Sequence, residues 1–236
     1  MLELKNIWVY YDKNAAVRNL SLTVKDGDFV TILGANGAGK STTLNAISGA
    51  VKVKKGKGEI FFRGKKITGL EPPKIAALGI IQVPEGRKLW PLMTVEENLK
   101  LGAYLQKDRK QIKRTMEKVL TLFPDLKDKL YAKGRMLSGG QQQMAAIARG
   151  LMAQPEVLLF DEPSLGLSPI LRQHLAEIIK EISREGTTVV LVEQNARLGL
   201  MLATYGYVIE NGELVLQGKT SDLLNDENVK KAYLGV

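Results

Sequence analysis

The first third of the chain alternates apolar and polar residues, a pattern typical of β-strands that bury one face. The alternation runs over residues 2–9 and again over residues 20–24. The next apolar run, Phe29–Leu33, lacks alternation, so we expect a strand that is covered on both faces. It leads directly into glycines and a predicted helix from about Gly39 to Ala50. Two more short strands are predicted at residues 59–63 and 80–83.

The middle of the chain changes to the helical spacing of apolar residues. Thr94 and Ser138 each begin a capping-box pattern, in which a hydroxyl and a Glu or Gln three residues later satisfy free backbone N–H groups at the start of a helix. These patterns predict helices that continue to about Tyr104 and Ala153. A third helix is predicted between them, at residues 107–123.

Strands and helices alternate after residue 153, which implies a parallel sheet covered by helices. The predicted strands are 157–160, 187–192 and 205–210, and the predicted helices are 170–185 and 196–203. Asn211-Gly212 is a strong hairpin signal that leads into a last strand, 213–217. We therefore expect a single α/β domain. Its core would be residues 1–87 and 154–236, and residues 88–153 would form an inserted helical subdomain.

Composition narrows the classes of function. The chain has 236 residues, of which 44% are hydrophobic, with no cysteine and one histidine, His174. This composition excludes disulfides, thiol catalysis and cysteine metal sites, and we expect His174 to be a surface or packing residue. The start of the chain lacks the apolar core of a signal peptide. The longest uncharged stretch, Leu198–Ile209, is shorter than the ~20 residues that span a bilayer.

The formal charge of +9 raises the question of nucleic-acid binding. Much of the excess positive charge lies in residues 51–67 and 107–118. Neither stretch interleaves aromatic residues with the cations, as a platform for single-stranded nucleic acid would. The second stretch has the helical spacing of a solvated face. We therefore expect basic solvated surface and no nucleic-acid partner, with a lipid headgroup or an acidic partner as the alternative.

The segment that follows Phe29–Leu33 fits the phosphate-loop pattern G-x-x-x-x-G-K-[ST]. Its glycines let backbone N–H groups surround the phosphates of a nucleotide, and the following helix adds a favourable dipole. We expect Lys40 to neutralise the β- and γ-phosphates of ATP and Ser41 to ligate Mg²⁺. The nucleotide-binding residues predicted in this loop are Gly34, Asn36, Gly37, Ala38, Gly39, Lys40, Ser41 and Thr42.

Two carboxylates follow another apolar run. Asp161 comes after four apolar residues, which places it at the C-terminal end of a strand, where α/β sheets bind ligands. We expect Asp161 to hold Mg²⁺ through water, and Glu162 to act as the general base that polarises the attacking water. The alternative is an acidic pair that caps the turn before Pro163. Lys40 upstream favours the catalytic interpretation.

A second anion site is predicted where Ser138-Gly139-Gly140 opens a helix, since a hydroxyl and free N–H groups meet there. Residues 137–141 read Leu-Ser-Gly-Gly-Gln, and they stand between the phosphate loop and the acidic strand end. With these three motifs in this order, the chain resembles an ABC ATPase over essentially its full length. The resemblance implies the P-loop NTPase fold of that family, a RecA-like core with an antiparallel β subdomain and an inserted helical subdomain.

The resemblance also implies roles for several residues. The signature residues Ser138, Gly139, Gly140 and Gln141 would contact the γ-phosphate of ATP held by the phosphate loop of a partner chain. Gln82 matches the glutamine that joins Mg²⁺ and senses the transmembrane partner. Tyr11 matches the aromatic residue that stacks on adenine. Tyr10 is its rival, and a tyrosine buried in a strand is the alternative for either.

The resemblance can be narrowed. Pro84–Leu99 and the segments after Asp161 and Leu191 are similar to ATPase subunits of branched-chain amino acid importers. The short C-terminus, Ala232–Val236, is similar to the F-type (LivF-like) subunit rather than to its longer G-type paralogue. This implies two transmembrane permease subunits, a paralogous ATPase subunit or a second copy in a head-to-tail dimer, and a periplasmic or surface solute-binding protein that acts indirectly. It also implies a peripheral position at the cytoplasmic face of the cell membrane.

Two residues depart from the general ABC pattern. Gln194 stands where most members carry a histidine, and an amide can hydrogen-bond a γ-phosphate but cannot carry a proton. We therefore expect Gln194 to position groups in the catalytic site and Glu162 to remain the base. Ser168 stands at the position of the usual aspartate in the loop that links the two active sites. Both features recur in the subgroup that resembles the branched-chain amino acid importers.

Alternative functions stay open at this point. An importer of the same subgroup for urea or short amides would keep the chemistry and change the solute. A soluble ABC ATPase of cofactor assembly has a similar size, although Pro84–Leu99 argues against it. Chromosome and repair ATPases place a long coiled coil between their motifs, for which the interval from Lys40 to Asp161 leaves no room. Translation-type members carry two ATPase domains, and this chain has one.

Overall fold

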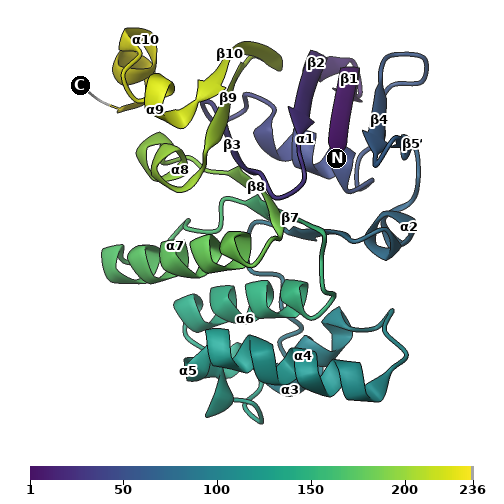
Figure 1. The fold of residues 1–236 in the computed structure, drawn as a ribbon, viewed down its shortest axis with the longest axis vertical. Coiled ribbons are helices and arrows are strands. Elements are labelled where there is room, and N and C mark those ends of the chain that lie inside the picture. The colour runs from purple at the N-terminus through teal and green to yellow at the C-terminus, as the bar shows by residue number, and fades with distance from the viewer. Residues whose placement is uncertain (235–236) are drawn as a thin grey trace.

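A computed structural model describes residues 1–234 and has the α/β architecture expected, with two sheets packed together at one end of the molecule and a group of helices at the other (Figure 1). Gly235 and Val236, which belong to the C-terminal segment compared above with F-type subunits, lie outside the described residues. The strands are β1 Leu2–Tyr11, β2 Asn14–Val24, β3 Phe29–Leu33, β4 Glu59–Phe62, β5 Lys65–Lys66, β6 Ile80–Val83, β7 Val157–Asp161, β8 Thr188–Val192, β9 Tyr205–Glu210 and β10 Glu213–Lys219. The helices are α1 Lys40–Ile47, α2 Pro72–Ala77, α3 Val95–Gly102, α4 Arg109–Leu122, α5 Pro124–Lys127, α6 Gly139–Leu151, α7 Pro169–Arg184, α8 Ala196–Leu202, α9 Thr220–Leu223 and α10 Glu227–Val229.

The larger sheet has the strand order β10-β9-β3-β8-β7-β6, and its strands are parallel except for β10, which joins β9 through the predicted Asn211-Gly212 hairpin. The smaller sheet is antiparallel, with the order β2-β1-β4-β5. The prediction of an α/β fold with a parallel core and an antiparallel β region is therefore confirmed. Among residues 1–234, no helix has both the length and the apolar character needed to cross a bilayer.

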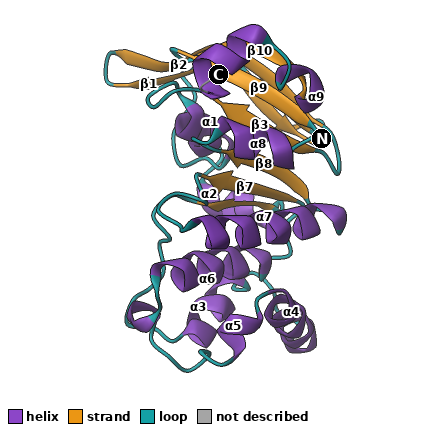
Figure 2. Ribbon diagram, turned by 90° about the vertical axis from the view of Figure 1, so that its left-hand side faces the viewer, coloured by secondary structure: helices purple, strands orange, loops and turns teal. Residues whose placement is uncertain are grey.

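The central strands are buried along their whole length, as the apolar runs without alternation predict. In β7, Val157 and Leu159 pack with α1 and the smaller sheet, whereas Leu158 and Phe160 pack on the opposite face with α6 and α7. Successive residues of a strand point to opposite faces, so a strand between two apolar layers must be apolar at every position. The carboxyl edge of the sheet therefore lies between these two apolar layers, and both α6 and α7 cover the same face of the sheet (Figure 2).

The helices between β6 and β7 begin where the capping patterns place them. Thr94 and Ser138 are the N-caps of α3 and α6, and both capping boxes are formed, with Glu97 and Gln141 as the reciprocal partners. Asp108 caps α4 in a simpler way, by accepting a hydrogen bond from the Lys110 amide at 2.8 Å. The assignment of residues 88–153 as a separate subdomain stays a prediction.

The short helices α2, α5, α9 and α10 escape the periodicity analysis. The helix predicted at residues 107–123 ends at Leu122, and Pro124 then begins the one-turn helix α5. Proline ends one helix and is favoured at the first position of the next, so the same residue has both effects. Pro72 begins α2 in the same way. All these helices are too short to show a 3.6-residue period.

Exposed lysines of residues 51–67 lie beside aromatic side chains of β1. Lys57 Nζ lies 4.3 Å from the centroid of the Trp8 ring, and both Lys54 and Lys57 lie 5.7 Å from the centroid of Tyr10. Trp8 and Tyr10 are themselves stacked, with centroids 6.1 Å apart. Trp8 and Tyr10 belong to β1, so these aromatic partners lie outside the basic stretch and no pattern within residues 51–67 indicates them. Each contact is a cation–π interaction within this chain.

The loop that enters α3 is held by one buried side chain. Asn98 is fully buried, and its Oδ1 accepts a hydrogen bond from Trp90 N at 2.9 Å. Its Nδ2 donates to Trp90 O at 3.1 Å and to Thr94 O at 2.9 Å. Trp90 itself remains 60% exposed at the surface of this loop. A single amide therefore fixes the loop backbone while the loop presents its indole to solvent.

We expect Asn98→Ala to lower the free energy of unfolding by about 2–3 kcal/mol, because it leaves buried backbone groups of the loop without partners. Urea unfolding followed by circular dichroism and tryptophan fluorescence measures this. Lys100→Ala removes an exposed side chain of the same helix and is the control, with an expected change within ~0.5 kcal/mol. Equal unfolding midpoints for the two variants would contradict the assigned role of Asn98.

Candidate functional site

The predicted site residues follow the carboxyl ends of adjacent parallel strands. The phosphate loop follows β3, Asp161 ends β7, and Gln194 lies two residues beyond β8. Gln82 lies within β6, at the edge of the same sheet. Because parallel strands have all their carboxyl ends at one edge, segments far apart in sequence meet there.

The phosphate loop is wedged between two backbone segments. A Cβ on Gly34 would lie 2.3 Å from Ile209 O, and a Cβ on Gly39 would lie 2.5 Å from Ala16 O. Gly39 also has a φ of +103°, which favours glycine. The loop can therefore pass here only with glycine at both positions.

The helix that follows the loop starts without a side-chain cap. Gly39 is the N-cap of α1 and offers no side chain to the free amides of the first turn, whereas α3, α4, α6, α7 and α8 all have capping side chains. Free amides at a helix start bind anions and add the favourable end of the helix dipole. These residues fit a nucleotide phosphate, which would supply the missing acceptors.

Four side chains meet beside this helix start. Ser41 Oγ donates to Asp161 Oδ1 at 2.8 Å, which joins the phosphate loop to β7. Lys40 Nζ donates to Gly34 O at 3.0 Å and lies 3.7 Å from Glu162 Oε1. Lys40 and Asp161 are buried, with exposed fractions of 4% and 5%. Burial raises the pKa of Asp161, and the nearby carboxylates Glu162 and Glu85 add to the rise, while the hydrogen bond from Ser41 opposes it.

Glu162 occupies a strained backbone position. Its φ is +46°, and its backbone amide donates to Val192 O at 2.9 Å, so the end of β8 holds the turn that follows β7. Left-handed backbone is costly for a residue with a Cβ and is found where a side chain has to be aimed. The turn keeps the Glu162 carboxylate beside Lys40 and in the site.

These residues line a cavity of about 390 Å³. Its walls hold the phosphate loop, Glu162 and Gln194, together with Glu85 and Leu165, which the sequence interpretation did not assign to it. The lining residues are Asn36, Gly37, Gly39, Lys40, Ser41, Thr42, Glu85, Glu162, Leu165 and Gln194. Gly34 and Ala38 also belong to the phosphate loop, but they are buried and do not line the cavity. The loop, the predicted base and Gln194 are therefore brought together in one cavity.

Gln82 reaches the site through α1. Its Nε2 donates to Asn45 Oδ1 at 2.9 Å, and Asn45 lies one helical turn after Ser41 on the same face of α1. Within residues 1–234 the oxygen of the Gln82 amide accepts no hydrogen bond. Oxygen ligands from a hydroxyl, a carboxylate and an amide suit Mg²⁺. Ser41, Asp161 and Gln82 thus have the chemistry to hold the metal.

A buried acid behind the cavity has no role in the sequence interpretation. Glu193 is 2% exposed, and its carboxylate accepts hydrogen bonds from Ser164 N at 3.1 Å and Ser164 Oγ at 2.9 Å. Burial, together with the charge of Glu162, raises the pKa of Glu193 to about 7 against these hydrogen bonds. The bonds tie the turn after β7 to the turn after β8, the two turns that carry Glu162 and Gln194. In the sequence, Glu193 could have been found as a charged residue that directly follows the four apolar residues 189–192.

The two candidate tyrosines differ in their surroundings. Tyr10 stacks on Trp8 and accepts a hydrogen bond from Lys57 at 3.4 Å, so its ring is engaged within the chain. Tyr11 is 47% exposed and pairs with Asn14 at the end of the β1–β2 ribbon. Asn14 is two residues from Ala16, which touches the phosphate loop, a separation of roughly 7 Å along a strand. The structure therefore favours Tyr11 and leaves its role a prediction.

The signature residues are not in this cavity. Ser138 is exposed at the start of α6, where Gly139 contacts the side chain of Arg87 and Gly140 packs on Leu171 of α7. Ser168 is the N-cap of α7, a role that the aspartate usual at this position could also fill. His174 is exposed on α7, as expected. The predicted residues therefore form two separate groups on one chain.

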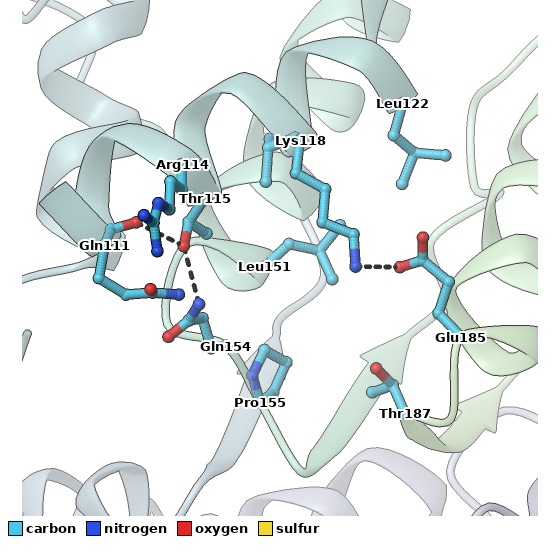
Figure 3. A pocket seen from close by; sticks show the side chains of 11 residues that line it. Gln111, Arg114, Thr115, Lys118, Leu122, Leu151, Gln154, Pro155, Glu185 and Thr187 are labelled. Atoms are coloured by element: carbon cyan, nitrogen blue, oxygen red, sulfur yellow. Dashed lines mark hydrogen bonds and ion pairs between the residues drawn. The ribbon is translucent and has the colours of Figure 1, made fainter.

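A different cavity, of about 380 Å³, lies between α4 and the far ends of β7 and β8 (Figure 3). Two polar contacts cross it. Gln154 Nε2 donates to Thr115 Oγ1 at 2.8 Å, and Lys118 Nζ lies 2.8 Å from Glu185 Oε2. No residue predicted to bind nucleotide lines this cavity. It marks a contact between α4 and the core on the side away from the phosphate loop.

Comparison with known proteins identifies the family. The ABC transporter family profile matches residues 17–165. The chain is 46% identical over all of both chains to the high-affinity branched-chain amino acid transport ATP-binding protein BraG of Pseudomonas aeruginosa. In Archaeoglobus fulgidus it is 33% identical to a probable branched-chain amino acid transport ATP-binding protein LivF, covering 98% of this chain and 94% of that one, and 32% identical to LivG, covering 100% and 95%.

Solved structures agree with the sequence relatives. A nucleotide-free ATP-binding cassette from an ABC transporter has a TM-score of 0.85 and 29% identity, and it covers 100% of this chain and 99% of that one. A dimeric cassette in a post-hydrolysis state, bound to ADP and Pi, has a TM-score of 0.83 and 28% identity, covering 93% and 99%. These comparisons confirm the predicted fold and the resemblance to ABC ATPases. The similar identities to LivF and LivG leave the F-type assignment a prediction.

We expect stability to depend on pH through Glu193. In the folded chain Glu193 keeps its proton up to about pH 7, whereas in the unfolded chain it keeps it only up to about pH 4.5. Its contribution to the free energy of unfolding is therefore complete below pH 4.5 and is lost as the pH rises through 7. Glu193→Gln keeps partners for Ser164 and stays uncharged. It should exceed the unfolding free energy of the parent by less than about 1 kcal/mol at pH 5 and by up to about 3 kcal/mol at pH 8.

Chemical denaturation at pH 5, 6, 7 and 8 measures the difference. Glu213→Gln, at an exposed position of β10, is the control and should leave the pH profile unchanged. Parallel profiles for the parent and Glu193→Gln would show that the buried carboxyl does not titrate in this range.

Proposed function

The chain belongs to the ABC transporter family as an ATP-binding subunit, and from this membership we propose that it hydrolyses ATP to drive uptake of branched-chain or related amino acids. The proposed solute class is supported by the full-length similarity to BraG. The signature residues lie apart from the phosphate-loop cavity of the same chain, and this separation supports the proposal of a catalytic site completed by a second chain. The same observation supports dividing the chain into a core, residues 1–87 and 154–236, and a helical subdomain, residues 88–153.

Two ATPase chains would pair head to tail, this one with a second copy or with a paralogue. Each ATP would lie between the phosphate loop of one chain and Ser138-Gly139-Gly140 of the other. A dimeric relative with bound ADP and Pi supports this arrangement. Each chain holds half of a site, so hydrolysis depends on association.

Within one chain, the free amides at the start of α1 and the Lys40 ammonium would bind the phosphates. Lys40 now bonds the carbonyl of Gly34, which shows that the ammonium can reach across the loop. Ser41, Asp161 and Gln82 would hold Mg²⁺, which supplies positive charge to the phosphates when bound. Tyr11 would stack on adenine.

Glu162 would act as the base. Its carboxylate lies in the cavity beside Lys40, and its backbone is fixed by the hydrogen bond to Val192. Gln194 lines the same cavity and would hydrogen-bond the γ-phosphate or the attacking water. Glu193 and Ser164 would keep these two residues at a constant separation.

The permeases would dock near Gln82 and the Glu85–Trp90 segment. Trp90 and Leu92 are 60% and 67% exposed in a loop whose backbone Asn98 fixes. A rigid loop that presents apolar side chains suits a protein interface. The chain would then work as a peripheral subunit at the cytoplasmic face of the membrane, with two permeases and, indirectly, a solute-binding protein.

We expect Glu162→Gln to bind ATP with unchanged affinity and to lose turnover by at least about 100-fold, because the amide cannot accept the proton of the attacking water. In the presence of ATP the variant should also accumulate as a closed dimer. Phosphate release and analytical ultracentrifugation measure the two effects, with Glu213→Gln as the control. Normal turnover by Glu162→Gln would remove the base assignment.

We expect Tyr11→Ala to weaken ATP binding by at least about fivefold, since stacking of a base on an aromatic ring contributes ~1–3 kcal/mol. Tyr10→Ala is the matched control and should bind ATP normally. Isothermal titration calorimetry gives both affinities. The reverse result would assign adenine stacking to Tyr10.

Purification of this chain from its native membranes in mild detergent tests the transport assignment. Two polytopic permeases and a second ATPase subunit are the expected companions. Uptake assays with the reconstituted complex then show whether the transported solute is a branched-chain amino acid or is urea or a short amide. Soluble partners alone would overturn the transport proposal and leave the ATPase chemistry standing.

A further inference from the structure

Arg87 sits at a strained turn between β6 and α3. Its φ is +68°, that of Lys88 is +37°, and the Lys88 amide donates to Gly86 O at 2.7 Å. A three-residue turn closed in this way around a positive φ is rare and costly for a residue with a Cβ. Such strain persists only where the surroundings fix it, so the direction of the Arg87 side chain is set by the fold.

The turn aims the Arg87 guanidinium at the start of α6. A Cβ built on Gly139 would lie 2.6 Å from Arg87 Nη1 and 2.9 Å from both Cζ and Nη2. A Cβ on Gly166, in the loop after β7, would lie 3.7 Å from Nη2. The guanidinium therefore lies flat against the glycine of the signature segment and borders the loop that leads to Ser168.

This placement leaves positive charge without a counter-charge. The start of a helix carries the positive end of the dipole, and a cation there is unfavourable. The first turn of α6 holds no acidic residue. Within residues 1–234, Arg87 makes no hydrogen bond or ion pair with the side chains or backbone around it, so its five N–H donors face solvent or a ligand. An anion placed at Ser138-Gly139 would satisfy the helix amides and the guanidinium together.

We propose that Arg87 contacts the γ-phosphate of the ATP that the partner chain's phosphate loop presents to this signature segment. The inference rests on the head-to-tail dimer proposed above and adds a phosphate-binding residue to it. The guanidinium offers two parallel N–H donors to phosphate oxygens, which a helix start alone does not. Gly139 is required beside it, because any larger side chain would push the guanidinium away.

The position also links the nucleotide to the permease side. Arg87 lies three residues before Trp90, whose backbone Asn98 holds. A phosphate that draws Arg87 toward the partner chain pulls on the same loop that would contact the membrane subunits. The γ-phosphate is thereby sensed from the opposite chain, in addition to Gln82 from its own.

The test compares ATP-driven dimerisation of the Glu162→Gln chain with that of the same chain carrying Arg87→Ala, Arg87→Lys or Lys88→Ala. It uses this chain alone, or mixed with the paralogous ATPase where the membrane purification yields one. We expect Arg87→Ala to leave ATP binding by the monomer unchanged and to weaken dimerisation with ATP by about tenfold or more. Arg87→Lys should recover part of the loss, and Lys88→Ala should behave as the parent.

The outcomes separate the two proposals. If Glu162→Gln fails to dimerise with ATP in either setting, the head-to-tail site is overturned and this inference with it. If Glu162→Gln dimerises and Arg87→Ala dimerises equally well, only the role of Arg87 is overturned. If Arg87→Ala weakens ATP binding by the monomer itself, the residue acts within its own chain and the assignment to the partner's nucleotide is wrong.

Discussion

The close packing of the phosphate loop against β2 and β9 is the constraint on which the rest of the site depends. The loop passes within contact distance of Ala16 O and Ile209 O, and only glycines at 34 and 39 allow it. The two strands belong to different sheets, so the loop is also the place where the sheets meet. It fixes the start of α1, and through α1 it fixes Lys40, Ser41 and Asn45. A flexible turn of the same composition would leave these groups without a common orientation.

The site concentrates acidic side chains. Asp161, Glu162 and Glu193 lie at the ends of two neighbouring strands, and Lys40 is the buried cation among them. Burial and mutual repulsion raise the pKa of Asp161 and of Glu193. The Mg²⁺ of a bound nucleotide would supply positive charge to this cluster, so nucleotide binding and the protonation of these carboxyl groups are linked. The turn at Glu162 keeps its carboxylate beside Lys40 at the cost of a left-handed backbone.

The signature segment at the start of α6 has an excess of positive charge, in contrast to the acidic phosphate-loop cavity. The start of α6 and Arg87 place two positive groups together with no acid in the first turn of the helix. One chain therefore carries a binding half, in which Asp161 and Glu162 lie near Lys40, and a signature half with unsatisfied positive charge. In the proposed head-to-tail dimer these two halves would be complementary, and ATP with Mg²⁺ would supply the ligands of both. The Trp90 loop joins Arg87 to the surface where the permeases would dock.

The sequence by itself determined the elements and the local chemistry. Apolar runs specified β3, β7 and β8, capping boxes specified the starts of α3 and α6, and the phosphate-loop spacing specified a nucleotide site, because each depends on neighbours within a few residues. Short helices such as α2 and α5 fell below the length at which periodicity is visible. Only the tertiary structure decided the contacts between distant segments. It placed Glu193 on Ser164, Lys57 on Trp8 and Arg87 on Gly139, since burial, strain and the approach of a side chain to another backbone depend on how the strands and helices pack, and no local pattern encodes that packing.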